Sequence, residues 1–182
     1  MSDSAPFRIA LLGLGNLMRT DDAAGMLALR RIKECGRLPP KIRVIEGGTL
    51  GLDLLDGLRG ISHLLALDAV DTGAVPGTLS RFEGNEIDNL PVSKSVHLLG
   101  FSDLMGALRL MDAAPKEVVL LGVQPASTDW GTLLSPEVDL ALQALMQSAL
   151  AQLTRWMSNP PRSLQTRESS DLEIVAWQGI SV

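Results

Sequence analysis

Short apolar runs alternate along the chain with longer stretches in which apolar residues recur every three or four positions. The short runs have the length of buried strands, and turn residues bound them. They cover residues 7–12, 42–45, 63–69 and 117–123, with a weaker edge strand over 77–82. The amphipathic stretches predict helices over about 23–35, 50–58, 97–111 and 135–157. Strands that alternate with helices predict an α/β fold, a three-layer sandwich whose mostly parallel central sheet is flanked by helices (phosphorylase/hydrolase-like).

The domain organisation follows from length and from one change in composition. A chain of 182 residues is long enough for one domain with a substantial core. We expect that domain to span 1–157. Residues 158–182 include Asn159-Pro160-Pro161 and are rich in serine, glutamine and charge, so we expect a flexible C-terminal tail there.

Composition excludes several functional classes. The net charge is −5, so a basic surface for nucleic acid or anionic lipid is not expected. The single cysteine, Cys35, rules out an intramolecular disulfide and a cysteine metal cage. We find neither a signal peptide nor an apolar run of membrane-spanning length, which favours a cytoplasmic protein. We take a monomer as the starting assumption.

A glycine turn, Gly13-Leu14-Gly15-Asn16, follows the first predicted strand, where a dinucleotide-binding motif would lie. Glu46, after the second strand, has the place of a ribose-binding acid. However, Met18 stands where the motif needs its third glycine, and acids at the start of the helix would repel a pyrophosphate. A nucleotide-binding module therefore stays the less favoured alternative. The simplest interpretation is that the glycines permit a tight turn.

Three residues with metal affinity are expected beyond the carboxyl ends of the strands. They are Asp22, Asp68 and His97, two carboxylates and an imidazole, which suit a divalent first-row metal and leave coordination positions open. Each has a simpler alternative. Asp22 and His97 are also ordinary residues for the start of a helix, and a buried Asp68 needs only a polar or charged partner. The other histidine, His63, is expected to face solvent and to have no role.

An ordered series of motifs then points to a family. The series comprises Gly13-Leu14-Gly15-Asn16, Thr20-Asp21-Asp22, Glu46-Gly47-Gly48-Thr49, residues 63–69, Pro76-Gly77-Thr78, His97, Phe101-Ser102-Asp103-Leu104 and Gly122-Val123-Gln124-Pro125. In this order the motifs resemble the hydrogenase maturation proteases, which process nickel-iron hydrogenase large subunits. The resemblance runs from about Ile9 to Trp156. Gln124-Pro125 and Asp129-Trp130-Gly131 are most similar to the branch that serves membrane-bound uptake hydrogenases.

The resemblance implies an endopeptidase that recognises the nickel-loaded precursor of the large subunit and removes its C-terminal peptide. It also implies that Asp22, Asp68 and His97 contact the metal. Asp22 stands where the family usually has Glu, so its carboxylate lies about 1.5 Å further back, and Asp21 is a competing ligand. Glu46 replaces the family's Asp. The nickel belongs to the substrate, and no tightly held cofactor of the protein's own is expected.

The residues indicate the attacking group only in part. Neither a Ser-His-Asp or Cys-His pairing nor an HExxH motif is evident, so hydrolysis needs an activated water. The candidates for the base are Asp22, Asp68 and Glu46. The candidates for binding the substrate peptide are Gly47, Gly48 and Thr49. A metal-binding checkpoint protein that docks the precursor without cutting it remains the main alternative.

Overall fold

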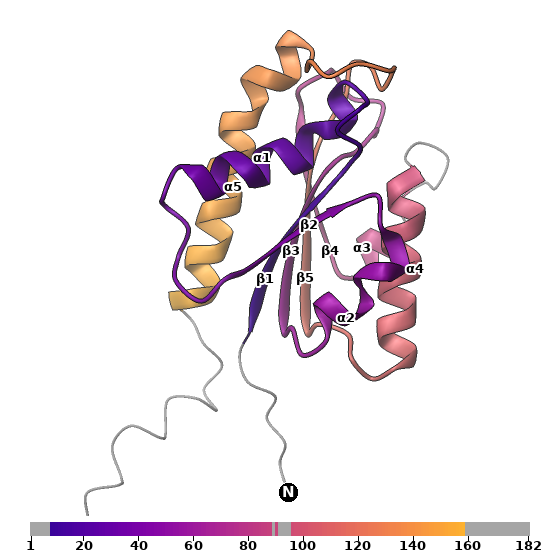
Figure 1. Cartoon of the computed structure of the whole chain (residues 1–182), viewed down its shortest axis with the longest axis vertical. Coiled ribbons are helices and arrows are strands. Elements are labelled where there is room, and N and C mark those ends of the chain that lie inside the picture. The colour runs from indigo at the N-terminus through magenta and orange to yellow at the C-terminus, as the bar shows by residue number, and fades with distance from the viewer. Residues whose placement is uncertain (1–7, 89, 91–95, 159–182) are drawn as a thin grey trace, which may run out of the picture.

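The computed structural model describes residues 8–88, 90 and 96–158 of the 182-residue chain (Figure 1). Within them, one sheet has the strand order β2-β1-β3-β5-β4. Its strands are β1 (Ile9–Leu14), β2 (Arg43–Gly48), β3 (His63–Ala69), β4 (Leu79–Glu83) and β5 (Glu117–Val123). β4 is the antiparallel edge strand, and the other four strands are parallel. The predicted mostly parallel sheet is confirmed.

Helices cover both faces of this sheet. One face carries α1 (Ala24–Glu34) and α5 (Pro136–Ser158), which pack against each other. The opposite face carries α2 (Leu55–Leu58), α3 (Asn85–Asp88) and α4 (Val96–Leu110), as Figure 1 shows. Two 3-10 turns connect strands to helices: η1 (Asp21–Ala23) leads into α1, and η2 (Gly51–Leu54) leads into α2. The three-layer sandwich is therefore the observed architecture.

The central strands explain why the core has two halves. Every residue of β1 and β3 is buried, as expected for strands covered by helices on both sides. Alternate side chains enter different clusters: Leu11 and Leu65 pack under α1 and α5, whereas Leu12 and Leu64 pack under α4. Because successive residues of a strand face opposite sides of the sheet, the position of a side chain in β1 or β3 decides which helical layer it packs against.

The boundaries differ little from those predicted. β3 and β5 begin and end at the expected residues, and the last helix extends to Ser158, the first residue of the predicted tail. Residues 159–182, the rest of that tail, lie outside the described residues. The helix expected over 50–58 is divided into η2 and α2. Among the described residues, no helix has both the length and the apolar character needed to cross a bilayer.

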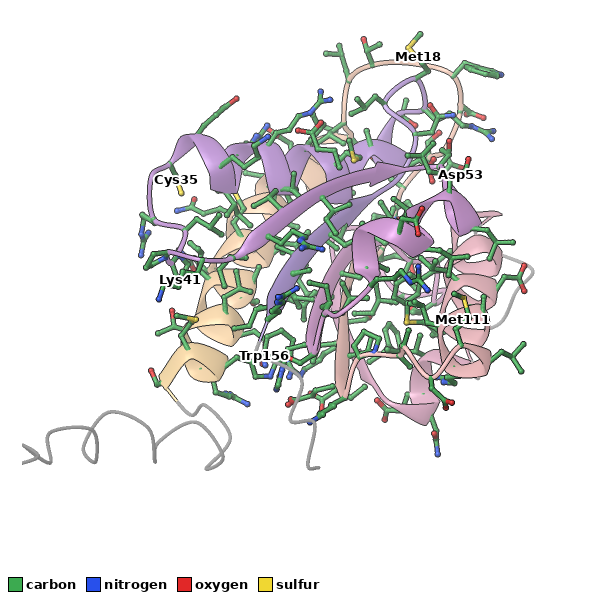
Figure 2. All side chains as sticks on the ribbon, turned by 60° about the horizontal axis from the view of Figure 1, so that its bottom comes forward. Met18, Cys35, Lys41, Asp53, Met111 and Trp156 are labelled. Carbon is green, nitrogen blue, oxygen red and sulfur yellow. The ribbon has the colours of Figure 1, made fainter. Side chains whose placement is uncertain are left out.

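The prediction that His63 faces solvent is wrong. His63 is buried, with its ring edge-on to Trp156 at 5.2 Å between centroids. The hydroxyl of Ser62 lies 2.9 Å from its Nδ1. Trp156 belongs to the last turns of α5, which cover the start of β3, far from Met18 at the other end of the molecule (Figure 2). The first residue of β3 is therefore part of the core.

Candidate functional site

Asp68 lies near the carboxyl end of β3 and is completely buried. Its Oδ1 accepts a hydrogen bond of 2.8 Å from the backbone N–H of Ala69. Because Leu67 packs in the layer of α1 and α5, the next side chain in the strand belongs to the layer of α4. A buried carboxylate at the end of a central parallel strand has the position typical of functional groups in open α/β sheets.

Asp22 lies in η1, directly after the turn that ends β1, and is also buried. Its Oδ2 accepts a hydrogen bond of 3.0 Å from the backbone N–H of Asn16. Gly15 makes this closure possible, since its φ is +116° and a Cβ there would lie 1.9 Å from the carbonyl oxygen of Asp22. The glycine turn therefore holds Asp22 in place, in agreement with the interpretation that its glycines permit a tight turn.

A second glycine brings η1 close to the end of β3. A Cβ at Gly25 would lie 2.2 Å from the carbonyl oxygen of Leu67 and 2.6 Å from that of Leu14. The start of α1 thus touches the last residues of β1 and β3, and η1 contacts β3 directly. The structure in this way brings Asp22 and Asp68 to the same end of the sheet.

Asp21, the neighbour of Asp22, makes a different set of hydrogen bonds. It is completely buried, and its carboxylate accepts four hydrogen bonds of 2.6–3.1 Å. The donors are the backbone N–H groups of Ala126, Ser127 and Ser135 and the hydroxyl of Ser135. These bonds engage both carboxylate oxygens in contacts with the loop after β5, which favours Asp22 over Asp21 as a metal ligand. Sequence reasoning missed this role because the partners lie more than 100 residues further along the chain.

His97 belongs to the first turn of α4, but its side chain lies outside the part of the structure that is described. Figure 1 shows the N-terminal end of α4 directed toward the end of the sheet where the parallel strands finish. Among the described side chains, no three His, Cys, Asp or Glu residues gather closely enough to hold a metal ion. The predicted trio of Asp22, Asp68 and His97 includes His97, whose side chain is not among those described. The metal site formed by this trio therefore stays a prediction.

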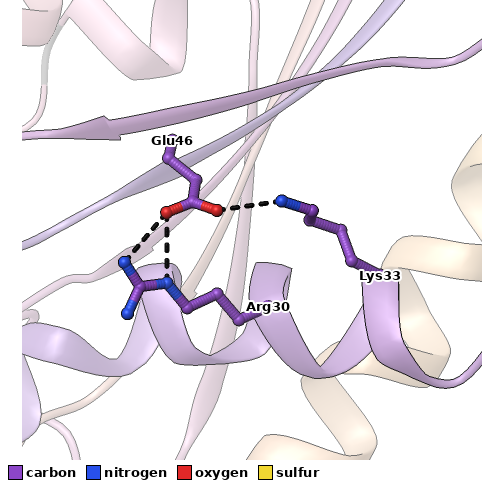
Figure 3. Close-up of polar contacts among 3 residues, drawn as sticks. All are labelled: Arg30, Lys33 and Glu46. Atoms are coloured by element: carbon purple, nitrogen blue, oxygen red, sulfur yellow. Dashed lines mark hydrogen bonds and ion pairs between the residues drawn. The ribbon is translucent and has the colours of Figure 1, made fainter.

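Glu46 lies on the face of the sheet that α1 covers. Its carboxylate binds Arg30 at 2.9 Å and Lys33 at 3.0 Å, both from α1 (Figure 3). Glu46 and Leu67 are both in register with Gly13, so they share this face, whereas Asp68 has the opposite parity. The hydrogen bonds from Lys33 and then from Arg30 lower the pKa of Glu46, which makes it a weaker base. The structure does not bring Glu46 together with Asp68.

The three residues predicted to bind substrate peptide follow Glu46. Gly47 is buried, and a Cβ there would lie 2.6 Å from Cδ1 of Leu12 and 3.1 Å from the carbonyl oxygen of Gly13, so tight packing favours glycine. Gly48 has φ +52°, and its carbonyl accepts a 3.0 Å hydrogen bond from the N–H of Gly15. Thr49 is exposed. These residues therefore lie beside the turn that seats Asp22, and their contact with a substrate stays a prediction.

Gln124 is a further residue of the site that sequence reasoning did not single out for a role. Its Oε1 accepts hydrogen bonds from the N–H groups of Thr72 (2.8 Å) and Ala74 (3.2 Å). Its Nε2 donates to Oδ1 of Asp71 at 3.0 Å. The buried amide thereby fixes the segment that follows Asp68. The signal in the sequence was a polar residue directly after a buried strand.

Comparison with known proteins identifies the family of this chain. Residues 26–152 match the family model of the hydrogenase maturation proteases, a range that includes Asp68 and His97. The chain is 34% identical over 154 residues to the hydrogenase expression/formation protein HupD of Rhodobacter capsulatus, covering 83% of this chain and 73% of HupD. It is 34% identical over 148 residues to the hydrogenase 2 maturation protease of Escherichia coli, covering 80% and 90% of the two chains.

Solved structures agree with the fold. The maturating endopeptidase HybD of E. coli superposes with a TM-score of 0.76 at 32% identity, over 82% of this chain and 93% of that one. The maturation protease HybD of Thermococcus kodakarensis gives 0.69 at 28% identity, over 81% and 99%. The sheet, the two buried acids at one end of it and these matches lead to one conclusion: the chain belongs to the hydrogenase maturation protease family, whose members are endopeptidases.

Proposed function

We propose that the protein removes the C-terminal peptide from the nickel-loaded precursor of a nickel-iron hydrogenase large subunit. The observation that carries the proposal is the pair of buried acids, Asp22 and Asp68, at the carboxyl end of the sheet. They come from separate segments, and both lie at the end of the sheet where open α/β folds hold their sites. Membership of the family supplies the reaction class, and the HupD relatives agree with the uptake branch indicated by Gln124-Pro125.

The nickel in this proposal is part of the substrate. Asp22, Asp68 and His97 contact it, and their oxygen and nitrogen donors suit a divalent first-row ion. Without such an ion, two carboxylates directed at one point repel each other. A precursor that lacks nickel is therefore disfavoured, and one that carries it is selected, which makes cleavage conditional on metal insertion.

The chemistry asked of the protein is the hydrolysis of one peptide bond. A water molecule attacks the scissile carbonyl carbon, the C–N bond breaks, and the new amine takes up a proton. Asp68 is the favoured base for that water, since it is fully buried near the carboxyl end of the central strand β3. Glu46 is not favoured, because two cations hold its carboxylate on the other face.

The proposal also places the reaction in the cytoplasm. The single cysteine, which cannot form an intramolecular disulfide, is in keeping with a reducing compartment.

The decisive experiment incubates the purified protein with the large-subunit precursor, with and without nickel, and follows the mass of the large subunit. We expect shortening of the loaded precursor only. Asp68→Asn, His97→Ala and Asp22→Ala should each slow processing by about 100-fold or more while the protein stays folded. Asp22→Glu should retain activity, since it restores the family's residue. Asp53→Asn, in an exposed acid of η2, is the control.

Two outcomes would contradict the proposal in different ways. Binding of the loaded precursor without any shortening would favour the checkpoint protein that docks but does not cut. Normal processing by Asp68→Asn would leave the function intact and show that the site lies elsewhere.

A further inference from the structure

Two loops at the carboxyl end of the sheet are joined into a short ribbon. Residues 18–20, after β1, pair antiparallel with residues 129–131, after β5, through two backbone hydrogen bonds of 3.1 and 3.0 Å. Arg19 and Trp130 stand directly opposite each other in this pairing. We call residues 18–20 and 129–131 the two-loop ribbon. It joins segments that are more than 100 residues apart in the chain.

Side chains hold the ribbon in one arrangement. Nε of Arg19 donates to the carbonyl of Thr128 at 2.8 Å, and the hydroxyl of Thr20 donates to the carbonyl of Ser127 at 2.7 Å. Beneath it, Asp21 fixes the same loop by its four hydrogen bonds. An element ordered in advance loses little conformational entropy when it binds another molecule.

The ribbon presents large apolar side chains to solvent. Trp130 is 77% exposed, with the guanidinium of Arg19 5.6 Å from its ring centroid, and Met18 is 58% exposed. Leu133, three residues after Trp130, is 81% exposed. Figure 2 shows Met18 at the outer edge of the molecule, beside the loop that leads to α5. Tryptophan and arginine are the residues that most often dominate binding energy at protein interfaces.

The exposed apolar residues are concentrated at this end of the sheet. Among the described residues, most of the large hydrophobic side chains exposed to solvent lie in segments that follow the carboxyl ends of β1, β2, β3 and β5. They are Met18, Leu50, Leu52, Val75, Trp130 and Leu133. The buried acid Asp22 follows β1, and the buried acid Asp68 lies near the end of β3, so both belong to this end of the sheet. A protein substrate that reaches those acids must pass over this rim.

We propose that the two-loop ribbon is the docking surface for the large-subunit precursor, with Trp130 and Met18 covering an apolar segment of it next to the bond that is cut. This rests on the proposed function, because the occupant is the substrate of that function. The ribbon runs without interruption into Asp21 and Asp22, so an occupant bound there lies at the entrance to the site. A protease gains specificity when contacts remote from the chemistry hold its substrate.

The test separates docking from cutting. Processing of the nickel-loaded precursor is measured with Trp130→Ala. The matched control is Leu140→Ala, which removes a similarly exposed side chain (81%, against 77% for Trp130) from α5. We expect Trp130→Ala to raise KM about tenfold or more and to change kcat less than about twofold. Leu140→Ala should change neither constant. Thermal unfolding confirms that both variants fold.

A binding measurement keeps this inference distinct from the proposed function. The dissociation constant of the nickel-loaded precursor is measured with Asp68→Asn alone and combined with Trp130→Ala. Weaker binding of the combined variant than of Asp68→Asn alone supports the docking surface even if no processing is seen. An unchanged dissociation constant and KM for Trp130→Ala overturn it. So does sedimentation showing that Trp130→Ala merely dissociates a dimer, which would assign the ribbon to a second copy of the chain.

Discussion

The carboxylate of Asp21 accepts hydrogen bonds from both the backbone N–H and the hydroxyl of Ser135, 114 residues further along the chain. Ser135 immediately precedes α5, and Asp21 is the first residue of η1, which leads into α1. The two long helices on one face of the sheet are thereby joined at the end where Asp22 and Asp68 lie.

Asp21→Ala should be strongly destabilising. It removes the buried carboxylate that accepts four part-buried hydrogen bonds, and we expect a cost of about 3 kcal/mol in the free energy of unfolding. Asp139→Ala, which breaks an exposed ion pair between α5 and Arg31, should cost less than about 1 kcal/mol. Urea denaturation of the two variants measures the difference. Equal losses would show that Asp21 is not the link between the helices.

Glu46→Gln should leave processing unchanged. Glu46 lies on the α1 face of the sheet and is held there by Arg30 and Lys33, away from the layer that Asp68 faces. Its ion pairs are partly exposed, so their loss should cost less than about 1 kcal/mol of stability. The rate of precursor shortening is the measurement. A large fall in that rate, with folding intact, would restore Glu46 as a catalytic candidate.

Gly25→Ala and Gly106→Ala should have opposite effects, although both glycines are helical. A Cβ at Gly25 would overlap the carbonyl oxygen of Leu67, so α1 must move away from β3, and we expect a loss of about 3 kcal/mol. Gly106, in α4, has nothing within 4 Å of the added Cβ, and alanine should stabilise by about 0.5–1 kcal/mol. Denaturation midpoints of both variants decide this. Processing should fall only in Gly25→Ala, because Asp22 moves with the helix.

His63 should make stability depend on pH. Burial, aided by the charge of Lys116, lowers the pKa of His63 below its ordinary value of 6.5, while Glu117 acts in the opposite direction. Below pH 6.5 the unfolded chain therefore binds a proton that the folded protein does not, so the free energy of unfolding decreases as the pH falls. We expect this decrease between pH 7.5 and 5.5 in urea unfolding.

The matched variant for that experiment is His63→Phe, which retains an aromatic ring against Trp156 and cannot titrate. Its stability should change less over the same pH range than that of the unchanged protein. The same slope in both proteins would mean that other groups cause the pH dependence.

The pattern of apolar residues was sufficient for much of the fold. β3 and β5 were predicted to the residue, because an uninterrupted apolar run of strand length between turn residues has few other uses in a covered parallel sheet. The antiparallel edge strand β4 was placed within two residues, since the turn Val75-Pro76-Gly77 and weak alternation identify it. The order of motifs was likewise enough to indicate the family.

The local sequence could not predict which of several similar residues has which contacts in the folded protein. Asp21 and Asp22 are adjacent acids at the start of a helix. Asp21 accepts hydrogen bonds from the loop after β5, whereas Asp22 accepts one from Asn16 in the glycine turn. Glu46 and Asp68 both lie toward the end of a strand, but their side chains enter opposite layers. His63 is buried because α5, almost 100 residues later, packs over it. Such distinctions arise from contacts between distant segments and from the layer that each strand face meets, and neither is encoded in the neighbours of a residue.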